Sequence, residues 1–195
     1  MANKNLIIAV TGTPGSGKST FAKELADSLE NSELVEINDI VDKYKLFSSI
    51  DKLESKIVKL DALQTKMDEI IKDDLKRSNL IIVGHLVAEI KLEQDITIVI
   101  RVGLKELVKR LEARNYQKEK IRENIVSESV DYCGIKSREN CKETYEIETK
   151  EQKKEMVDYV KGVISGKKAK MPNTEEISKF KELLELIMDG NKYGL

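Results

Sequence analysis

The sequence has few of the residues and segments that mark secreted or membrane proteins. Its 195 residues include two cysteines, one histidine and no tryptophan. Because no histidine or further cysteine lies at ligand spacing from Cys133 or Cys141, a zinc site is not expected. A disulfide between the two is conceivable, but reduced thiols fit better. The run "NLIIAV" is too short for a signal peptide, and no run approaches the ~18 apolar residues of a membrane span. We therefore expect a cytoplasmic protein without membrane contact.

An excess of charge of either sign is also missing. The 34 Lys and Arg residues are balanced by 35 Asp and Glu residues, which gives a formal net charge of −1. Such a balance does not attract nucleic acid over the whole surface, so no direct nucleic-acid contact is expected, although a local basic patch would be compatible with it. The length suits one α/β domain with a substantial core.

The segment "GTPGSGKST" (12–20) fits the phosphate-binding pattern G-x-x-x-x-G-K-[ST]. It follows an Ile/Val-rich run typical of a buried strand and precedes a segment with apolar residues at helical spacing. Glycines let backbone N–H groups approach a polyphosphate closely, and the following helix directs its positive dipole end at the anion. In such a loop Lys18 reaches the β- and γ-phosphates and the Ser19 hydroxyl can ligate Mg²⁺. A glycine-rich turn that binds nothing is the alternative.

Strands and helices alternate along the chain. Strands are expected at 5–11, 33–40, 80–86, 95–102 and 143–149, with helices after 18 and within 61–79, 104–116, 118–130 and 150–164. The segment from Val41 to about Lys59 is charged and helical in period, and we interpret it as a peripheral insertion. This order predicts an α/β fold of the P-loop NTPase type, with a five-stranded parallel sheet and helices on both faces.

The C-terminal part is expected to be a linker and a separate helix. Residues 165–173 are linker-like, and Asn173 with Glu176 can form a capping box. The helix would carry an apolar stripe that packs on the domain or on a second copy, made of Ile177, Phe180, Leu184 and Ile187. We expect a domain over 1–168 and a tail over 169–195 that is dispensable for chemistry.

Phosphoryl transfer predicts further cations around the phosphates. No N-K-x-D guanine motif is present, which argues against a switch GTPase, and motors need far more chain. In a small nucleotide kinase, arginines are needed at the end of the fourth strand and on a mobile flap after it. Arg101 occupies the strand end, and Arg110 and Arg114 precede the flap. Ordinary solvated helix positions are the alternative for Arg110 and Arg114.

The segments "GTPGSGKST", "EINDI", "VGHL", "VIR" and above all "RLEARNYQKEKIRENI" together resemble the adenylate kinase isoenzyme 6 family in its archaeal form. Eukaryotic members of that family are nuclear and double as ATPases in small-ribosomal-subunit assembly. The resemblance runs from about Leu6 to Ile164.

The resemblance implies an adenylate kinase that uses ATP and Mg²⁺, with AMP as acceptor. It implies an AMP-binding insertion over about 38–62, starting at Asn38 and Asp39, and a lid over about 113–123. Arg114 matches the family's ATP-contacting lid arginine, and His85 matches a histidine after the third strand. The positions that match its ATP-contacting loop are Gly15, Gly17, Lys18, Ser19 and Thr20.

One position departs from the family pattern. Family members often have a carboxylate two residues before that histidine, where this chain has Val83. Mg²⁺ would then be held by Ser19, the phosphates and water, with Asp39 as the nearest outer carboxylate. Asp39 could instead cap a helix that begins at Ile40. His85 could orient the acceptor phosphate or a water, or form a structural hydrogen bond.

We therefore expect a monomeric or homodimeric kinase that moves the γ-phosphoryl group of Mg-ATP to AMP. Catalysis would come from positioning and charge neutralisation by Lys18, Arg114 and Arg101. Three alternatives stay open. They are a kinase for another nucleoside monophosphate, an ATPase in ribosome assembly with a small-subunit ribosomal protein as partner, and a protein that holds ATP without turnover.

Overall fold

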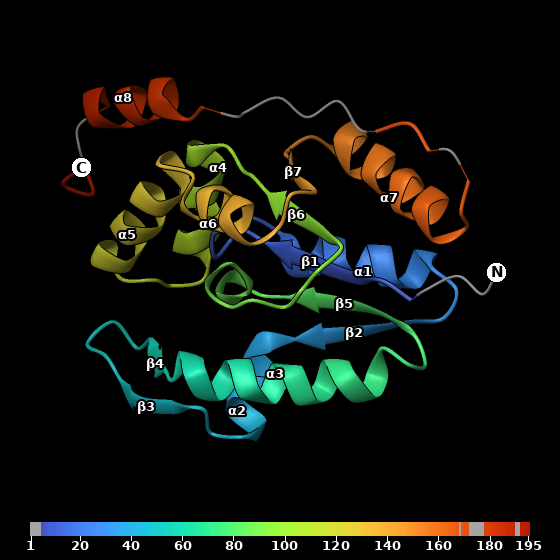
Figure 1. Ribbon diagram of the computed structural model, residues 1–195. Coiled ribbons are helices and arrows are strands. Elements are labelled where there is room, and N and C mark those ends of the chain that lie inside the picture. Colours follow the sequence, from blue (N-terminus) through green and yellow to red (C-terminus); the bar gives the residue numbers. More distant parts are fainter. Residues whose placement is uncertain (1–4, 168, 172–177, 190–191) are drawn as a thin grey trace.

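A five-stranded parallel sheet forms the centre of the protein (Figure 1). The computed structural model describes residues 5–167, 169–171, 178–189 and 192–195. The strand order is β2-β5-β1-β6-β7, and the bounds are β1 Ile7–Thr11, β2 Ser32–Glu36, β5 Asn79–Val83, β6 Ile96–Ile100 and β7 Thr144–Ile147. The first strand is therefore central, and the P-loop that follows it leaves the sheet at its carboxyl edge. This is the place where open α/β sheets bind ligands.

Helices cover both faces of the sheet and its carboxyl edge. None of the helices in the described ranges is long and apolar enough to cross a membrane. The helices are α1 Lys18–Ser28, α2 Ile37–Lys43, α3 Leu60–Asp74, α4 Leu104–Ala113, α5 Lys118–Ser129, α6 Tyr132–Asn140, α7 Lys150–Ile164 and α8 Phe180–Met188, with a 3-10 turn η1 at His85–Glu89.

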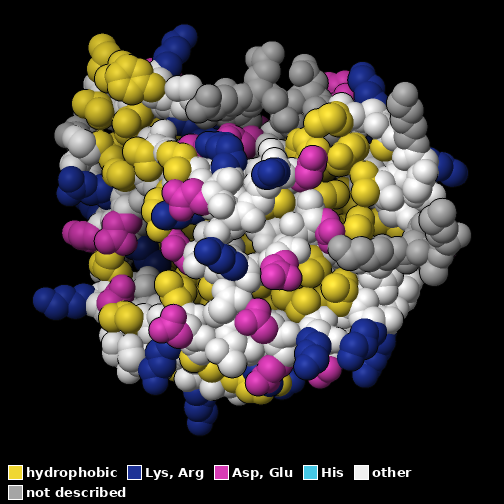
Figure 2. All heavy atoms as spheres, in the orientation of Figure 1, with side chains coloured by type: hydrophobic (Ala, Val, Ile, Leu, Met, Phe, Trp, Pro, Cys, Tyr) yellow, Lys and Arg dark blue, Asp and Glu magenta, His cyan; other side chains and the backbone are white. Residues whose placement is uncertain are grey.

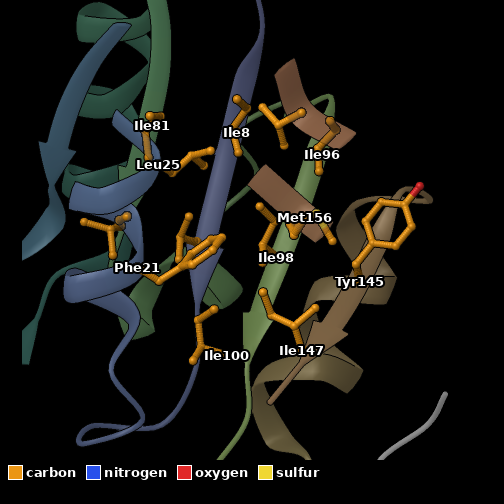
Figure 3. Close-up of a cluster of buried hydrophobic side chains, with 14 residues drawn as sticks. Ile8, Phe21, Leu25, Ile81, Ile96, Ile98, Ile100, Tyr145, Ile147 and Met156 are labelled. Carbon is orange, nitrogen blue, oxygen red and sulfur yellow. The ribbon is translucent and has the colours of Figure 1, made fainter. Parts of the chain in front are cut away.

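Each face of the sheet is covered by its own apolar cluster. Every residue of β1, β5 and β6 is buried, although successive side chains point to opposite faces. On one face, side chains of α1 and α7 meet the sheet, as Phe21, Leu25 and Met156 do in Figure 3. On the other face, Leu63 and Met67 of α3 pack with residues of α2, η1 and the sheet. Burial on both faces explains why these strands are continuous apolar runs. The expected α/β fold with a five-stranded parallel sheet and helices on both faces is confirmed.

The segment from Val41 to Lys59, interpreted as a peripheral insertion with helical period, is mostly not helical. Helix α2 ends at Lys43, and an antiparallel hairpin follows, with β3 Phe47–Ile50 and β4 Lys56–Val58. The Asp51 carboxylate accepts hydrogen bonds from the backbone N–H groups of Leu53 and Ser55, at 2.8 Å each. This local turn competes with a helix, because an Asp side chain can satisfy the backbone of a loop.

Two other elements differ from the expectation. Strand β2 ends at Glu36, and the residues after it already belong to α2. Helix α6 was not predicted, since its sequence "YCGIKSREN" has no apolar stripe. It starts at Asp131, whose left-handed backbone (φ 53°) and side chain cap the helix by accepting from the Gly134 N–H.

The C-terminal helix packs on the domain with a different face from the one predicted. The proposed Asn173 and Glu176 capping box, with Ile177, lies outside the described residues. In α8, Phe180, Leu184 and Ile187 are exposed, whereas Leu183 and Leu186 pack against the cluster between α4 and α5. Figure 2 shows hydrophobic side chains on the surface at the upper left, where Figure 1 places α8.

Candidate active site

The P-loop has the backbone conformation of an anion cradle. Gly12, Gly15 and Gly17 have φ values of +142°, +95° and +98°. A Cβ at Gly12 would lie 2.4 Å from the carbonyl oxygen of Ile100, so this glycine also permits close contact with β6. Gly17 caps α1, and Lys18 is the first residue of that helix. The loop therefore presents a helix N-terminus to an anion at the carboxyl edge of the sheet.

Helix α4 packs directly on this loop. A Cβ at Gly15 would lie 2.9 Å from Leu107 Cδ1 and 3.1 Å from Leu111 Cδ2. Arg110 Nη1 donates to the carbonyl oxygens of Gly15 and Ser16, each at 3.1 Å. Arg110 is thus not an ordinary solvated residue. It holds the P-loop backbone in place through these two hydrogen bonds. The sequence offered no signal for that role beyond the position of Arg110 ahead of the flap.

One side of the P-loop opens into a cleft of about 780 Å³, which we call the basic cleft. It contains five of the chain's cationic side chains and one carboxylate. Its lining residues are Gly15, Ser16, Gly17, Thr20, Phe21, Glu24, Arg110, Arg114, Lys150, Lys153, Lys154 and Val157. The expected ligand residues Gly15, Gly17, Thr20 and Arg114 are therefore together, and the surplus of positive charge suits a polyphosphate.

The other side opens into a cleft of about 490 Å³, which we call the His85 cleft. Its lining combines His85 and two lysines, Lys56 and Lys120, with four carboxylates. The remaining lining residues are Pro14, Asn38, Val41, Asp42, Glu54, Ser55, Val58, Leu86, Glu89, Tyr116, Glu123, Asn124, Ser127, Tyr132 and Cys133. The expected acceptor insertion and lid both contribute, so these segments far apart in sequence enclose one space.

Lys18 follows Gly17 at the start of α1 and, like Ser19, is not among the residues that line either cleft. Its ammonium group is 3.5 Å from the carbonyl oxygen of Thr13, so the side chain lies back over the loop. Burial, together with the charge of Arg114, lowers the pKa of Lys18 to about 8, while Cys133, Glu36 and Glu128 act in the opposite direction. At pH 7 the ammonium is therefore still mostly charged, and a bound phosphate would favour this charged form further.

His85 is largely buried and interacts with the charges of two lysines. Burial, with the charges of Lys18 and Lys120, lowers its pKa to about 4. The imidazole is therefore neutral at pH 7. Both the acceptor-phosphate and the structural interpretation of His85 remain compatible with this position, because the residue begins η1 and also lines the cleft.

The placement expected for Arg101 is contradicted by the structure. Its side chain is 1% exposed, and its Nε lies 2.8 Å from Glu128 Oε1. Its Nη1 lies 2.6 Å from Glu146 Oε2 and 2.8 Å from Asp131 Oδ1. Although burial alone would lower the pKa of Arg101, these carboxylates raise it. The guanidinium forms ion pairs with three internal carboxylates, and Arg101 lines neither cleft. Arg101 therefore stabilises the fold rather than contacting a phosphate.

Asp39 lies in the first turn of α2, where it is exposed and lines neither cleft. The alternative that it caps a helix starting at Ile40 is wrong, because α2 begins at Ile37 with Glu36 as its N-cap residue. Glu36 is better placed as the carboxylate near the P-loop. It pairs in register with Val83 on the neighbouring strand, and its charge raises the pKa of Lys18.

Glu128 was missed by sequence reasoning. Its side chain is 2% exposed. Its Oε2 accepts from the Thr13 hydroxyl at 2.6 Å, and its Oε1 accepts from Arg101 Nε and from the Val102 N–H. The buried Arg101 cluster therefore reaches the P-loop through one hydrogen bond. Nothing in a periodic helix pattern distinguishes this carboxylate from its solvated neighbours on α5.

The residues at the P-loop fit Mg²⁺ bound together with a nucleotide. Ser19 is exposed in the first turn of α1, directly after Lys18. Within the described ranges, no group of three or more His, Cys, Asp or Glu side chains is arranged to hold a metal ion. The Ser19 hydroxyl alone cannot enclose a metal ion. Mg²⁺ that is held by few protein oxygens usually completes its coordination shell with phosphates and water. Cys133 and Cys141 are free and buried.

Comparisons with known proteins agree with this architecture. Residues 8–131 match the family model described as "AAA domain". A protein of Methanocaldococcus jannaschii named "Putative adenylate kinase" is 34% identical over 181 residues, covering 92% of this chain and 97% of its own. A protein of the same name from Methanosarcina barkeri is 30% identical and covers 86% of this chain and 92% of its own.

Among solved structures, shikimate kinase from Bacteroides thetaiotaomicron superposes with a TM-score of 0.55 at 14% identity, covering 82% of this chain and 98% of that enzyme. At that identity the likeness establishes the fold alone, which is the P-loop kinase fold. The sequence relatives establish more, because they match nearly their whole length. The chain belongs to the AAA-domain family of P-loop proteins and, within it, to the family of these archaeal adenylate-kinase-like proteins.

Proposed function

We propose that the protein is an adenylate kinase of the isoenzyme 6 type that transfers the γ-phosphoryl group of Mg-ATP to AMP and yields two ADP. One observation carries the proposal. P-loop residues line both the basic cleft and the His85 cleft, and the charge of Lys18 lowers the pKa of His85 while the charge of Arg114 lowers that of Lys18. Two separate spaces on either side of one phosphate loop suit two substrates that exchange a phosphoryl group.

ATP would occupy the basic cleft. The P-loop N–H groups and Lys18 would hold its β- and γ-phosphates, and Arg114 would neutralise charge from the opposite wall of the cleft. When bound, Mg²⁺ would supply additional neutralisation of the phosphate charge, with Ser19 as the residue that holds it. The cytoplasmic location, expected from composition, and the ribosomal role, implied by the family resemblance, stay predictions.

AMP would occupy the His85 cleft, where an oxygen of its phosphate attacks the γ-phosphorus. The new P–O bond forms as the bond from the γ-phosphorus to the β,γ-bridging oxygen breaks, and the electron pair stays on the β-phosphate of the ADP that leaves. Lys120 would contribute positive charge to the acceptor phosphate, since it lines this cleft.

Enclosure of the acceptor is supported by a contact across the cleft. Lys120 Nζ of α5 donates to the carbonyl oxygen of Leu53, in the turn of the β3–β4 hairpin, at 2.9 Å. The contact joins the expected lid to the expected acceptor insertion. Such closure excludes water, which matters because water would otherwise accept the phosphoryl group.

The test is an assay of purified protein with Mg-ATP alone and with AMP, CMP, UMP or GMP, in which ADP and free phosphate are measured separately. We expect ADP formation that depends on AMP, without phosphate release. ADP formation with another monophosphate would reassign the acceptor. Phosphate release that does not depend on any monophosphate would favour an ATPase, and binding without turnover would leave a nucleotide-holding protein.

Lys18→Ala provides the matched control. It should lower kcat by ~10²-fold or more, comparable to the loss of one preorganised donor at a developing charge. Retention of near-normal transfer in this variant would remove the P-loop from the mechanism.

A further inference from the structure

A buried lysine anchors the C-terminal helix at the carboxyl edge of the sheet. Lys179 is 2% exposed, and its Nζ lies 2.6 Å from Glu148 Oε1 and 3.0 Å from Glu182 Oε1. Lysine is almost never buried to this degree unless it is paired. Glu148 directly follows β7 and precedes α7, the helix that contributes three lysines to the basic cleft. The anchor is therefore attached to one wall of that cleft.

The same helix caps α4. The backbone N–H of Leu104, the first residue of α4, donates to Glu182 Oε2 at 2.6 Å. Gly103 is the N-cap residue of α4 and provides no side-chain cap. A carboxylate at a helix N-terminus satisfies an otherwise unpaired N–H group and interacts favourably with the helix dipole. The cap of α4 thus comes from a residue of the tail.

The tail also contacts α4 at its other end. Lys192 Nζ and the Tyr193 hydroxyl lie 2.5 Å and 2.6 Å from Glu112 Oε1. Between these ends, Leu183 and Leu186 pack against the apolar cluster of α4 and α5, and Figure 1 shows α8 beside these helices. The tail therefore contacts α4 from its first turn to its last.

Helix α4 is the element that carries Arg110 and ends at Arg114. Arg110 holds two carbonyl oxygens of the P-loop, and the apolar face of α4 packs on Gly15. A displacement of α4 would move Arg110 and Arg114 relative to the P-loop, because Arg110 lies in this helix and Arg114 is its C-cap residue.

We propose that the C-terminal segment, residues 178–189 and 192–195, positions α4 and is thereby a structural part of the ATP site. Lys179 and Glu182 are its positioning residues. This inference rests on the proposed function in so far as the basic cleft binds ATP, and it is the opposite of the expectation that the tail is dispensable. It commits to one consequence, namely that loss of the anchor weakens ATP binding in the basic cleft while the His85 cleft is unchanged.

The experiment measures binding of the Mg²⁺ complex of β,γ-imido-ATP by calorimetry, in full-length variants and without any acceptor. Lys179→Met should raise the Kd at least fivefold, whereas Lys179→Arg should stay within about threefold of the wild type. Lys105→Met is the matched control, since Lys105 forms a solvent-exposed ion pair between the same two helices. The control should stay within twofold. The NMR signal of His85, the single histidine, should be unchanged in each variant.

An unchanged Kd in folded Lys179→Met would overturn the inference, and so would an equal loss in Lys105→Met. If Lys179→Met does not fold, Glu182→Ala replaces it, because it removes the acceptor of the Leu104 N–H while Lys179 keeps Glu148 as its partner. That variant should raise the Kd at least fivefold, and no rise would overturn the inference. If the wild type does not bind the ATP analogue, the proposed function and the inference are both wrong. If the wild type binds it and the variants bind equally well, only the inference is wrong.

Discussion

Protonation of His85 offers a sharp test of the site's electrostatics. Burial and the charges of Lys18 and Lys120 lower its pKa from 6.5 to about 4. At about 1.4 kcal/mol per pH unit, this difference corresponds to at most ~3.5 kcal/mol of folding free energy. Between pH 6.5 and 4, His85 is protonated in the unfolded chain but not in the folded protein. Its contribution to the free energy of unfolding is therefore intact above pH 6.5 and is lost as the pH falls from 6.5 toward 4.

The assay is a pH titration of the imidazole signals by NMR, which is unambiguous because the chain contains one histidine. We expect a midpoint near 4 in the free protein. AMP should raise it by at least one unit, because an anion close to an imidazole favours the charged form by ~1–3 units. In urea unfolding, His85→Asn should lose less stability than the wild type between pH 6.5 and 4. A free-protein midpoint near 6.5 would refute the reasoning.

The remaining predictions concern charged residues around the P-loop. Arg114→Lys should lower kcat for ATP and AMP by about tenfold in steady-state kinetics, since a point charge lacks the planar fork that grips two oxygens; unchanged kinetics would return Arg114 to a solvated helix position. Glu36→Gln should raise the Mg²⁺ concentration for half-maximal rate and Asp39→Asn should not, and the reverse result would restore Asp39 as the outer carboxylate. Arg101→Met should lower the free energy of unfolding by ~3–5 kcal/mol in urea titration, because three buried carboxylates lose their partner. A loss below ~1 kcal/mol would contradict the structural role of Arg101.

The elements predictable from sequence were those with a strong local signal. The P-loop, the buried strands and the helices with a clear apolar stripe were all found, and α7 was placed at its observed bounds. Burial imposes these patterns directly, because an apolar run or a 3.6-residue period is a consequence of the surface that each element covers.

The residues that were misplaced depend on tertiary pairing. Arg101 has the position expected for a phosphate ligand, yet its partners Glu128 and Glu146 come from α5 and β7, which no local pattern brings to it. The β3–β4 hairpin was missed because its alternation is short and one Asp side chain determines the turn. The apolar face of α8 was assigned to the wrong side for a similar reason, since its apolar residues form one broad arc and the sequence does not tell which edge of that arc packs inward.

The central place of β1 has a consequence for synthesis on the ribosome. Residues Ile7 to Thr11 emerge first, but their two hydrogen-bonded neighbours begin at Asn79 and Ile96. Long-range parallel pairing is slow because loop closure must precede the contacts that stabilise it. Gly12 also lies against the Ile100 carbonyl oxygen at the end of β6, where a Cβ would clash. A nascent chain is therefore not expected to bind ATP before β6 has left the exit tunnel.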